Sequence, residues 1–543
     1  MSNTHRNPTD TEINAVIKFY TSGQIEEARA VLIRLTRKYP NEALLYNFLG
    51  VCYATLNQTE AAFGSFESAL RINPDNAEVH YNLGNTLKAC DRLNASIKSY
   101  TRALEINPFH ADTHINLGNA FKGIGNIEKA VSHYEHAIQI NPSYTEAHCN
   151  LGNTLHVIGN LEAAISCYQQ ALSIDPSDAE AHNCLGNTYN DLGKTDAALS
   201  AIEQALTIKP TNPQFWASYA TALHQKKFKT FNESFSNYLV KALQQPTINP
   251  NYIAPAIVSA LQQHPKIKLA IKASKNDLIE KNLPFFSDQL ASISLFLALL
   301  ENCPIADPEI EYLLTQMRRA ALNQLFDSIL NGIDFSFYYS LALHCFTNEY
   351  IFFETDEEIQ NVTKLENKIN YQVNNNLPIP PIWIVLLASY RPLHNYLWAE
   401  QLQKTALPVN SHKILTRQLF DIKKEQHLKT KIHQLTSIND STSNAVKEQY
   451  EQNPYPRWIN PGLFDNPKTI RENLHAINPQ LSIDDNHYSK MPNILIAGCG
   501  TGQHALNSQS RFLNCTVLAI DLSLNSLSYA MRKTHELSIT NIN

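Results

Sequence analysis

The run Asn82-Leu83-Gly84-Asn85 returns as the same four letters at 116–119 and at 150–153, each time 34 residues further on. Three sets of small or rigid residues keep this interval. They are Pro40, Pro74, Pro108, Pro142, Pro176 and Pro210; Gly50, Gly84, Gly118, Gly152 and Gly186; and Ala69, Ala103, Ala137, Ala171 and Ala205. Small residues let two helices approach closely, and a proline ends a helix. The interval therefore predicts an array of paired helices.

A 34-residue period with these residues at fixed offsets resembles the tetratricopeptide repeat. Five units are clear, at 43–76, 77–110, 111–144, 145–178 and 179–212. A weaker unit precedes them at about 9–42, and a decayed unit follows at about 213–246. We therefore expect a repeat superhelix over 9–246, with its clear units at 43–212. Such an array presents a concave surface to partners.

Two rows of asparagines follow the repeat. One row stands directly after the glycine and contains Asn85, Asn119, Asn153 and Asn187; the other contains Asn82, Asn116 and Asn150. An asparagine offers both a donor and an acceptor, so a ladder of them could hold the main chain of an extended peptide. The runs resemble the asparagine ladder of the protein O-GlcNAc transferase superhelix. Alternatively, the amides bond neighbouring helices, and the sequence leaves both interpretations open.

Histidines also recur at this interval, at His80, His114, His148 and His182. Equivalent positions on successive helices lie at least ~8–10 Å apart. A zinc ion needs each ligand within about 2 Å. We therefore expect these histidines to pack within the repeats, and we predict no metal site.

A second kind of pattern lies near the C-terminal end. A short apolar run is followed by three alternate glycines, a helical pattern, another apolar run and an acid. These parts are Ile494–Ala497; Gly498, Gly500 and Gly502; 503–512; Thr516–Ile520; and Asp521. Glycines allow a sharp turn against a ligand, and an acid after the second strand can accept ribose hydroxyls. Ser523 is placed to cap a helix after Asp521.

The G-x-G-x-G spacing resembles motif I of class I S-adenosylmethionine-dependent methyltransferases. The resemblance implies S-adenosylmethionine as cofactor, a loop against its methionine part, and Asp521 on its ribose. The cofactor residues it implies are Ala497, Gly498, Cys499, Gly500, Thr501, Gly502, Gln503 and Asp521. Ala497 departs from the family, because many members carry an acid there, so a contact to the cofactor's amino group is absent or supplied elsewhere. The alternative is a glycine-rich turn of another α/β domain.

Between these regions, 247–440 is predicted to be a helical middle domain, and 445–490 a lead-in to the C-terminal unit at 491–543. Helical patterns occur at 251–263, 285–301, 308–325, 335–352, 356–373 and 381–390. The stretch 341–350 resembles bacterial proteins that join such repeats to a methyltransferase domain. Its Asn348, Glu349 and Tyr350 either serve function or cap a helical core. Tyr455 and Trp458 either cover the cofactor cleft or pack the junction.

Composition narrows the function further. The chain of 543 residues has a formal net charge of -6 and no basic face, so we expect no nucleic-acid partner. Its nine cysteines form no C-x-x-C pair, and its N-terminus has no apolar signal core. No apolar run is long enough to span a bilayer. These features lead us to expect a cytoplasmic protein without membrane contact.

The predicted fold is mainly α, with a tetratricopeptide-repeat superhelix, a helical middle domain and the first part of a Rossmann-like methyltransferase domain. Because a doubly wound core needs more than two strands, we expect a C-terminally truncated, inactive fragment whose next residues would form a third strand. The intact protein is expected to be a methyltransferase whose repeats bind a protein or peptide, with no catalytic residue assignable. One alternative is an interaction scaffold with a vestigial methyltransferase domain. A repeat-bearing glycosyltransferase is a weaker alternative, because too little chain remains for a sugar-nucleotide domain.

Overall fold

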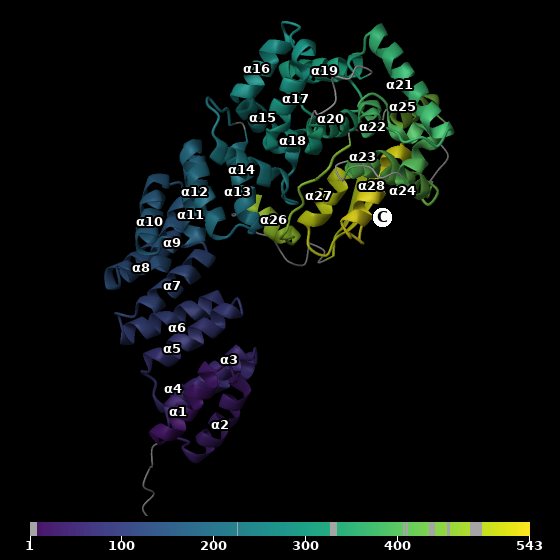
Figure 1. The fold of residues 1–543 in the computed structure, drawn as a ribbon. Coiled ribbons are helices and arrows are strands. Elements are labelled where there is room, and N and C mark those ends of the chain that lie inside the picture. Colours follow the sequence, from purple (N-terminus) through teal and green to yellow (C-terminus); the bar gives the residue numbers. More distant parts are fainter. Residues whose placement is uncertain are drawn as a thin grey trace, which may run out of the picture. The chain divides into compact units, whose positions relative to one another are not determined.

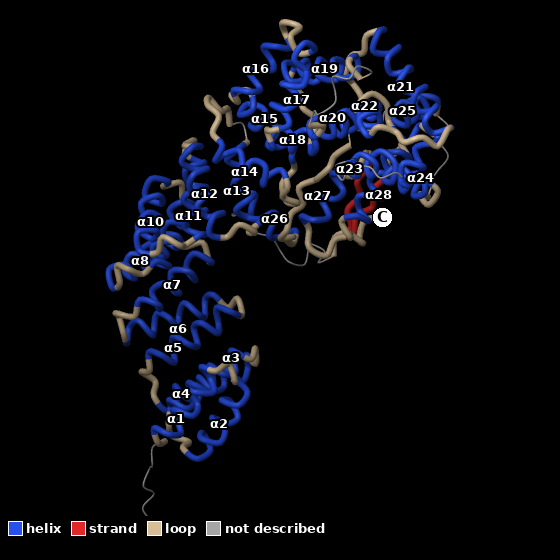
Figure 2. The backbone as a smooth tube through the Cα atoms, in the orientation of Figure 1, coloured by secondary structure: helices blue, strands red, loops and turns tan. Residues whose placement is uncertain are grey.

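The chain folds into two compact units, Met1–Pro210 and Thr211–Asn543, in a computed structural model. The structure describes residues 8–224, 226–325, 334–404, 408, 411–433, 440–452, 457–477 and 491–543. Helices make up most of both units (Figures 1 and 2). The domain boundaries expected from the sequence remain predictions.

The first unit is a series of helix pairs (Figure 1). An opening pair, α1 (Asp10–Thr21) and α2 (Ile25–Lys38), precedes the clear repeats. The first helices of these repeats are α3 (Ala43–Thr55), α5 (Ala77–Ala89), α7 (Ala111–Gly123), α9 (Thr145–Val157) and α11 (Ala179–Asp191). The second helices are α4 (Thr59–Ile72), α6 (Leu93–Ile106), α8 (Ile127–Ile140), α10 (Leu161–Ile174) and α12 (Thr195–Ile208). Each first helix begins where a predicted unit begins.

The repeated glycines lie where a side chain of the second helix presses on the first. A Cβ atom on Gly84 would lie 2.5 Å from the Tyr100 ring, and one on Gly118 would lie 2.7 Å from the Tyr134 ring. Both tyrosines are fully buried. The same contact recurs with Phe66 on Gly50, Tyr168 on Gly152 and Ile202 on Gly186. The glycine period therefore follows from close helix packing within each repeat.

The first helices of successive repeats also contact one another: α3 contacts α5, and α5 contacts α7. Among the described repeats, second helices make no comparably close approach to each other. An array whose first helices crowd together curves with those helices on its inner side. The asparagine rows lie on these first helices, and therefore on or beside the inner surface of the first unit.

The recurring histidines bond the proline that closes the preceding repeat. Their Nε2 atoms lie 2.9 to 3.1 Å from the proline carbonyl six residues earlier, in the pairs His80–Pro74, His114–Pro108, His148–Pro142 and His182–Pro176. This contact ties the start of each first helix to the turn before it. It accounts for the histidine period as packing, as expected. The described residues contain no cluster of three side chains suited to a metal ion.

The second unit begins with helices that follow no fixed period (Figure 1). They are α13 (Pro213–Leu223), α14 (Glu233–Leu243), α15 (Pro250–Leu261), α16 (Pro265–Ser274), η1 (Glu280–Asn282), α17 (Leu283–Ala291), α18 (Ser294–Asn302), α19 (Pro308–Asn323), α20 (Ser336–Thr347), α21 (Asp356–Asn374) and α22 (Pro381–Ala388). Shorter elements follow: η3 (Leu393–Asn395), η4 (Leu397–Lys404), α23 (Ser411–Leu415), the π-helix η5 (Thr416–Phe420), α24 (Asp421–Lys429), α25 (Ser441–Gln452) and α26 (Ile470–Ile477).

Two of the predicted helices in this region were wrong in extent. The pattern at 285–301 forms two helices, α17 and α18, because the chain bends by 86° between them. Ile293 is buried at this bend, so its apolar side chain continues the pattern without continuing the helix. The pattern at 335–352 ends as a helix at Thr347, because Glu349 and Tyr350 take left-handed φ angles of 56° and 57°.

The C-terminal part of the second unit holds a small parallel sheet, the red segments of the tube in Figure 2. Strand β1 (Asn493–Ala497) pairs in parallel with β2 (Thr516–Ile520), with Leu495 opposite Leu518. Helix α27 (Gln503–Arg511) connects them, and α28 (Leu524–Glu536) follows β2. Among the described residues this is a two-stranded sheet. On the edge of β2 away from β1, the N–H groups of Val517 and Ala519 donate to the carbonyls of Asn541 and Asn543 at 2.9 Å, and Val517 forms a parallel bridge with Ile542.

Along both strands, buried and exposed side chains alternate because they point to opposite faces of the sheet. Ile496 and Val517 are buried under α27 and α28 with Cys499, Ala505 and Cys515. Leu495 and Leu518 lie on the other face and are 63% and 46% exposed. The two strands are therefore apolar on both faces, as strands of a covered parallel sheet are. The Rossmann-like assignment goes beyond what two strands show.

No single helix in the described ranges is long and apolar enough to cross a membrane. Only together, as a bent pair, do Glu280–Ala291 and Ser294–Asn302 reach that length and composition.

Candidate functional site: the repeat face and the glycine-loop cleft

Each asparagine that follows a repeat glycine is tied to the tyrosine that packs on that glycine. The Tyr100 hydroxyl donates to Asn85 Oδ1 at 2.7 Å, and Tyr134 donates to Asn119 Oδ1 at 2.6 Å. Tyr168 donates to Asn153 Oδ1 at 2.7 Å. The carbonyl oxygens of this row are therefore used inside their own repeats. Their amide nitrogens have no protein partner in the described chain, so this row offers donors alone.

The fourth member of that row, Asn187, has no tyrosine opposite, because Ile202 takes the corresponding place. The second row bonds neighbouring helices. Asn82 Nδ2 donates to Asn47 Oδ1 at 3.1 Å, and Asn116 Nδ2 donates to the Tyr81 hydroxyl at 3.3 Å. The remaining one, Asn150, donates to Glu146 of its own helix at 3.4 Å. Interhelical bonding thus accounts for much of both rows, and peptide binding by their remaining donors stays a prediction.

The second candidate site begins at the glycine loop. The N–H groups of Gly498 and Cys499 donate to the Ile520 carbonyl at 2.8 and 3.1 Å, which draws the loop over the end of β2. Gly498, Gly500 and Gly502 have φ angles of 68°, 53° and 84°. This left-handed region suits glycine and strains other residues. The three glycines are thus needed for the path of the loop itself.

Asp521 joins this loop directly. Its Oδ2 accepts the Gly500 N–H at 2.7 Å, and its Oδ1 accepts the Ser523 N–H at 2.9 Å. The hydroxyl of Ser523 accepts the Ser526 N–H at 3.1 Å and caps α28 as predicted. A carboxylate oxygen has a second lone pair, so each oxygen of Asp521 can still accept one further donor. The structure therefore brings the predicted loop and the predicted acid together.

The other predicted cofactor residues differ in access. Ala497 and Gly498 are exposed, whereas Thr501 is buried and Gln503 is half-buried at the start of α27. A Cβ atom on Gly498 would meet nothing within 4 Å, but one on Gly502 would lie 2.5 Å from Ala530 Cβ. The open side of the loop is therefore at Gly498. Cys499 is buried, and this burial together with the charge of Asp521 raises the pKa of its thiol to about 12.

Trp458 packs against the glycine loop and bonds to its main chain. Its indole Nε1 donates to the Thr501 carbonyl at 3.0 Å, and its ring packs edge-on against Tyr529, with centroids 5.7 Å apart. The Tyr529 hydroxyl donates to the Trp458 carbonyl. Trp458 is 4% exposed, so of its two predicted roles it takes packing. Tyr455, which was predicted with it, lies outside the described residues.

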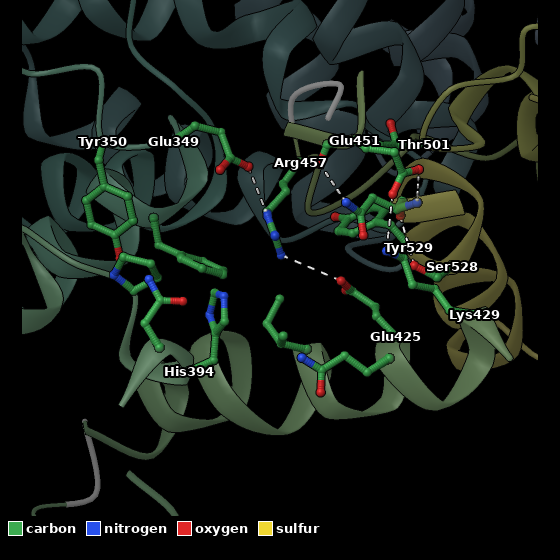
Figure 3. Close-up of a pocket in the computed structure, with 16 residues that line it drawn as sticks. Glu349, Tyr350, His394, Glu425, Lys429, Glu451, Arg457, Thr501, Ser528 and Tyr529 are labelled. Atoms are coloured by element: carbon green, nitrogen blue, oxygen red, sulfur yellow. Dashed lines mark hydrogen bonds and ion pairs between the residues drawn. The ribbon is translucent and has the colours of Figure 1, made fainter. Parts of the chain in front are cut away.

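A cleft of about 340 Å³ opens beside this loop (Figure 3). Its walls come from six separate stretches of the chain. The lining residues are Phe346, Glu349, Tyr350, Pro392, His394, Asn395, Ile422, Glu425, Gln426, Lys429, Glu451, Arg457, Thr501, Asn525, Ser528 and Tyr529. Thr501 belongs both to the glycine loop and to the cleft wall. The predicted segment at 341–350 and the residues around 457 thus meet at the loop.

Arg457 crosses this cleft from Glu349 toward Glu425 (Figure 3). Its Nε lies 2.9 Å from Glu349 Oε1, and its Nη1 lies 3.9 Å from Glu425 Oε2. The guanidinium also stacks over the Phe346 ring, 4.5 Å from the centroid. A partly desolvated cation over an aromatic face is stabilised by the ring. Arg457 therefore holds the two sides of the cleft together.

Buried charge on α24 and α28 supports the cleft floor. Glu425 Oε1 accepts Arg532 Nε at 2.8 Å, and Arg532 Nη1 lies 3.3 Å from Asp421. Burial raises the pKa of both carboxyls, and the arginine charges oppose that rise. His394 also lines the cleft, and burial and the Arg457 charge lower its pKa. Its buried Nδ1 has no hydrogen-bond partner among the described residues.

The structure separates the two roles suggested for 348–350. Tyr350 closes the helix end, since its N–H donates to the Cys345 carbonyl at 2.9 Å and its hydroxyl donates to the Ala388 carbonyl at 3.1 Å. Glu349 instead faces the cleft and pairs with Arg457. Glu425, His394 and Lys429 were not predicted from the sequence. They lie in η3 and α24, and only the docking of distant segments brings them to one place.

Comparison with protein-family models identifies the repeats. A model described as Tetratricopeptide repeat matches residues 14–77, another of that description matches 77–110 and 179–212, and a model described as TPR repeat matches 124–159 and 156–193. The helix pairs are tetratricopeptide repeats. The prediction of this repeat type is thereby confirmed. All matched residues lie between 14 and 212, so these models bear on the repeats and not on the cleft.

Solved structures with tetratricopeptide repeats are similar to part of the chain. YrrB, described as a TPR protein with an unusual peptide-binding site, shares 22% identity over 36% of this chain and 96% of its own, with a TM-score of 0.31. Pseudomonas aeruginosa PilF shares 18% over 40% and 97%, with a TM-score of 0.36. A thermophilic TPR protein of Thermus thermophilus shares 26% over 34% and 99%, with a TM-score of 0.28. No curated protein matches the chain.

Proposed function

We propose that the chain is a protein-interaction scaffold whose tetratricopeptide repeats hold an extended peptide along their first helices. The observation that carries this proposal is the row of Asn85, Asn119 and Asn153 on the inner helices. Tyrosine hydroxyls fix their orientation and leave one amide nitrogen on each free to donate. Main-chain carbonyls of a peptide are acceptors present at every residue, so such a row supports binding with little dependence on sequence.

Fluorescence anisotropy with a labelled neutral peptide of Pro, Ala and Ser tests this role. Asn119→Ala combined with Asn153→Ala removes two donors and should weaken binding roughly tenfold, at about 0.5–1.5 kcal/mol for each hydrogen bond. Asn94→Ala is the matched control, because Asn94 is an exposed asparagine on the second helix α6. Equal affinity of the double variant and the control would argue against peptide binding through the row.

A second function is favoured by the contact between the glycine loop and Asp521. We propose that the C-terminal part of the second unit binds S-adenosylmethionine and belongs to a methyltransferase. The left-handed glycines, the exposed and unobstructed Gly498 and the acid at the end of β2 fit a nucleoside ligand. Gly498 would lie against the ligand, and Asp521 would accept ribose hydroxyls with its remaining lone pairs. The bound cofactor would supply the reactive methyl group.

In this proposal the cleft binds the methyl acceptor, because Thr501 is part of the glycine loop and also lines the cleft. Glu349, Arg457 and Glu425 would orient the acceptor, and the buried aromatic walls would limit its water. His394 is the residue available to accept a proton there, at its unpartnered Nδ1. These roles deepen the methyltransferase proposal and depend on it.

Calorimetric titration of S-adenosylmethionine and S-adenosylhomocysteine into the chain separates the two candidate functions. Asp521→Ala should abolish measurable binding, whereas Asp465→Ala should leave it unchanged, because Asp465 is an exposed acid in the same unit. Binding that survives Asp521→Ala would refute the assigned ribose contact. If the folded chain binds neither compound, the methyltransferase proposal fails and the scaffold role is the one that remains.

A further inference from the structure

We infer that the inner face of the repeats selects an acidic extended peptide, with a carboxylate at about every third residue. This inference rests on the proposed scaffold function and names the class of its partner. It comes from the side chains next to Asn85 and Asn119, which add positive charge beside a row that already offers donors alone.

Two lysines extend the donor row. Lys88 and Lys122 lie 34 residues apart, each three residues after an asparagine of the row. Residues three apart on a helix share a face, so Asn85 and Lys88 lie side by side, as do Asn119 and Lys122. The Lys88 Nζ donates to Asn116 Oδ1 of the next first helix at 2.6 Å, which shows that this ammonium points along the inner helices. Lysine has donors and no acceptor.

Neither lysine lies within ion-pair distance of a carboxylate in the described chain, although the charge of Glu146 acts on Lys88 from further away. Both are half-buried, and burial lowers the pKa of both ammonium groups. The hydrogen bond of Lys88 goes to the neutral amide of Asn116, and Lys122 forms no ion pair with a described residue. Partly buried charges in proteins are normally paired, because desolvation without a partner is unfavourable. Two such ammonium groups in register indicate an external anion.

The acids nearest these helices are already engaged. Asp112 accepts the Tyr144 hydroxyl, Glu146 accepts the Asn150 amide at 3.4 Å, and Glu180 lies 3.6 Å from Lys209. Asp191 pairs with His156 at 2.7 Å. These carboxylates stand at helix starts or in other pairs, where helix dipoles and cations favour them. Next to Asn85 and Asn119, the groups left to bind a ligand are therefore the asparagine donors and the two ammonium groups.

The interval between repeats sets the spacing of the ligand. Equivalent residues on neighbouring packed helices lie ~8–10 Å apart. A polyproline II chain advances about 9.3 Å in three residues and then presents the same face again. In the two repeats at 77–144, one lysine and one asparagine each therefore match one carboxylate and one carbonyl at every third residue of the ligand. A β-strand, which repeats its face every ~6.8 Å, fits this interval less well.

The experiment uses the full chain and two fluorescein-labelled peptides of roughly four triplets, Pro-Ala-Glu and Pro-Ala-Gln, in anisotropy titrations. The Glu peptide should bind about tenfold more tightly than the Gln peptide, equivalent to about 1.4 kcal/mol. Lys88→Ala with Lys122→Ala should remove this difference, so that both peptides bind alike. Lys88→Arg with Lys122→Arg should preserve it, because the charge remains. Lys98→Ala is the control, since Lys98 is an exposed lysine on α6.

Each failure has a separate meaning. Equal binding of both peptides by the unchanged chain, with weaker binding after Asn119→Ala and Asn153→Ala, would overturn the acidic specificity and leave the scaffold intact. No binding of either peptide would overturn both. Tighter binding of a single-stranded polynucleotide than of the Glu peptide, with the same dependence on the two lysines, would assign the positive row to nucleic acid instead.

Discussion

Gly118→Ala and Gly64→Ala make the same chemical change in the first unit, and we expect opposite effects on stability. A Cβ atom on Gly118 would lie 2.7 Å from Cε1 of Tyr134, a fully buried ring whose hydroxyl is bonded to Asn119. A Cβ atom on Gly64 in α4 would meet nothing within 4 Å. Replacing glycine by alanine within a helix contributes about 0.8–1 kcal/mol when nothing obstructs the new methyl group.

At Gly118 the cost of the clash with Tyr134 exceeds the gain from replacing glycine by alanine within a helix. Forcing a methyl group into a packed core costs about 1–3 kcal/mol, and displacing Tyr134 would also lose a hydrogen bond worth about 0.5–1.5 kcal/mol. The net expectation is a destabilisation of about 1–3 kcal/mol. At Gly64 we expect a stabilisation of up to about 1 kcal/mol.

Hydrogen exchange measured by mass spectrometry suits this comparison, because a chain of two units need not unfold in one step. Each repeat contacts mainly its neighbours, so the change should be local. Peptides from 111–140 should lose protection roughly five- to hundredfold in Gly118→Ala. Peptides from 59–72 should gain it in Gly64→Ala. An increase of protection in both variants would refute the confinement of the Tyr134 ring.

Three further outcomes follow from particular contacts. Tyr168→Phe removes the donor to Asn153 and should cost about 1 kcal/mol, measured as faster exchange in 145–174; unchanged exchange would mean that the hydroxyl contributes nothing. Gly502→Ala places a Cβ atom 2.5 Å from Ala530 Cβ at a φ of 84°, so limited proteolysis of 493–543 should accelerate, and equal rates would contradict the close packing. Burial lowers the pKa of His133 to about 4. The folded state therefore keeps His133 neutral between about pH 6.5 and 4, whereas the unfolded state takes up a proton there. The free energy of unfolding should fall as the pH drops through this range, and His133→Phe should flatten this dependence in thermal scans.

The repeats are the part of this protein that sequence alone determined. Prolines, glycines and alanines 34 residues apart predicted the helix pairs, and the first helices begin at residues 43, 77, 111, 145 and 179 as the period requires. The physical reason is locality. Each repeat buries its apolar side chains against the adjacent repeats. The residues that constrain one another therefore lie within a few tens of positions in the sequence. The strand, loop, helix, strand and acid near the C-terminal end were predicted for the same reason.

Only the tertiary structure decided how the asparagines and the cleft are built. A ladder of asparagines in sequence offers donors and acceptors equally, and the hydroxyls of Tyr100, Tyr134 and Tyr168 remove the acceptors. Arg457 meets Glu349 across 108 residues of chain, and Arg532 meets Glu425 across 107. No local pattern specifies these pairs, because their partners are chosen when α20, α24 and α28 dock and bury their charges together. That docking brings Glu425, His394 and Lys429 to the cleft beside the glycine loop, and the sequence had predicted none of these three residues there.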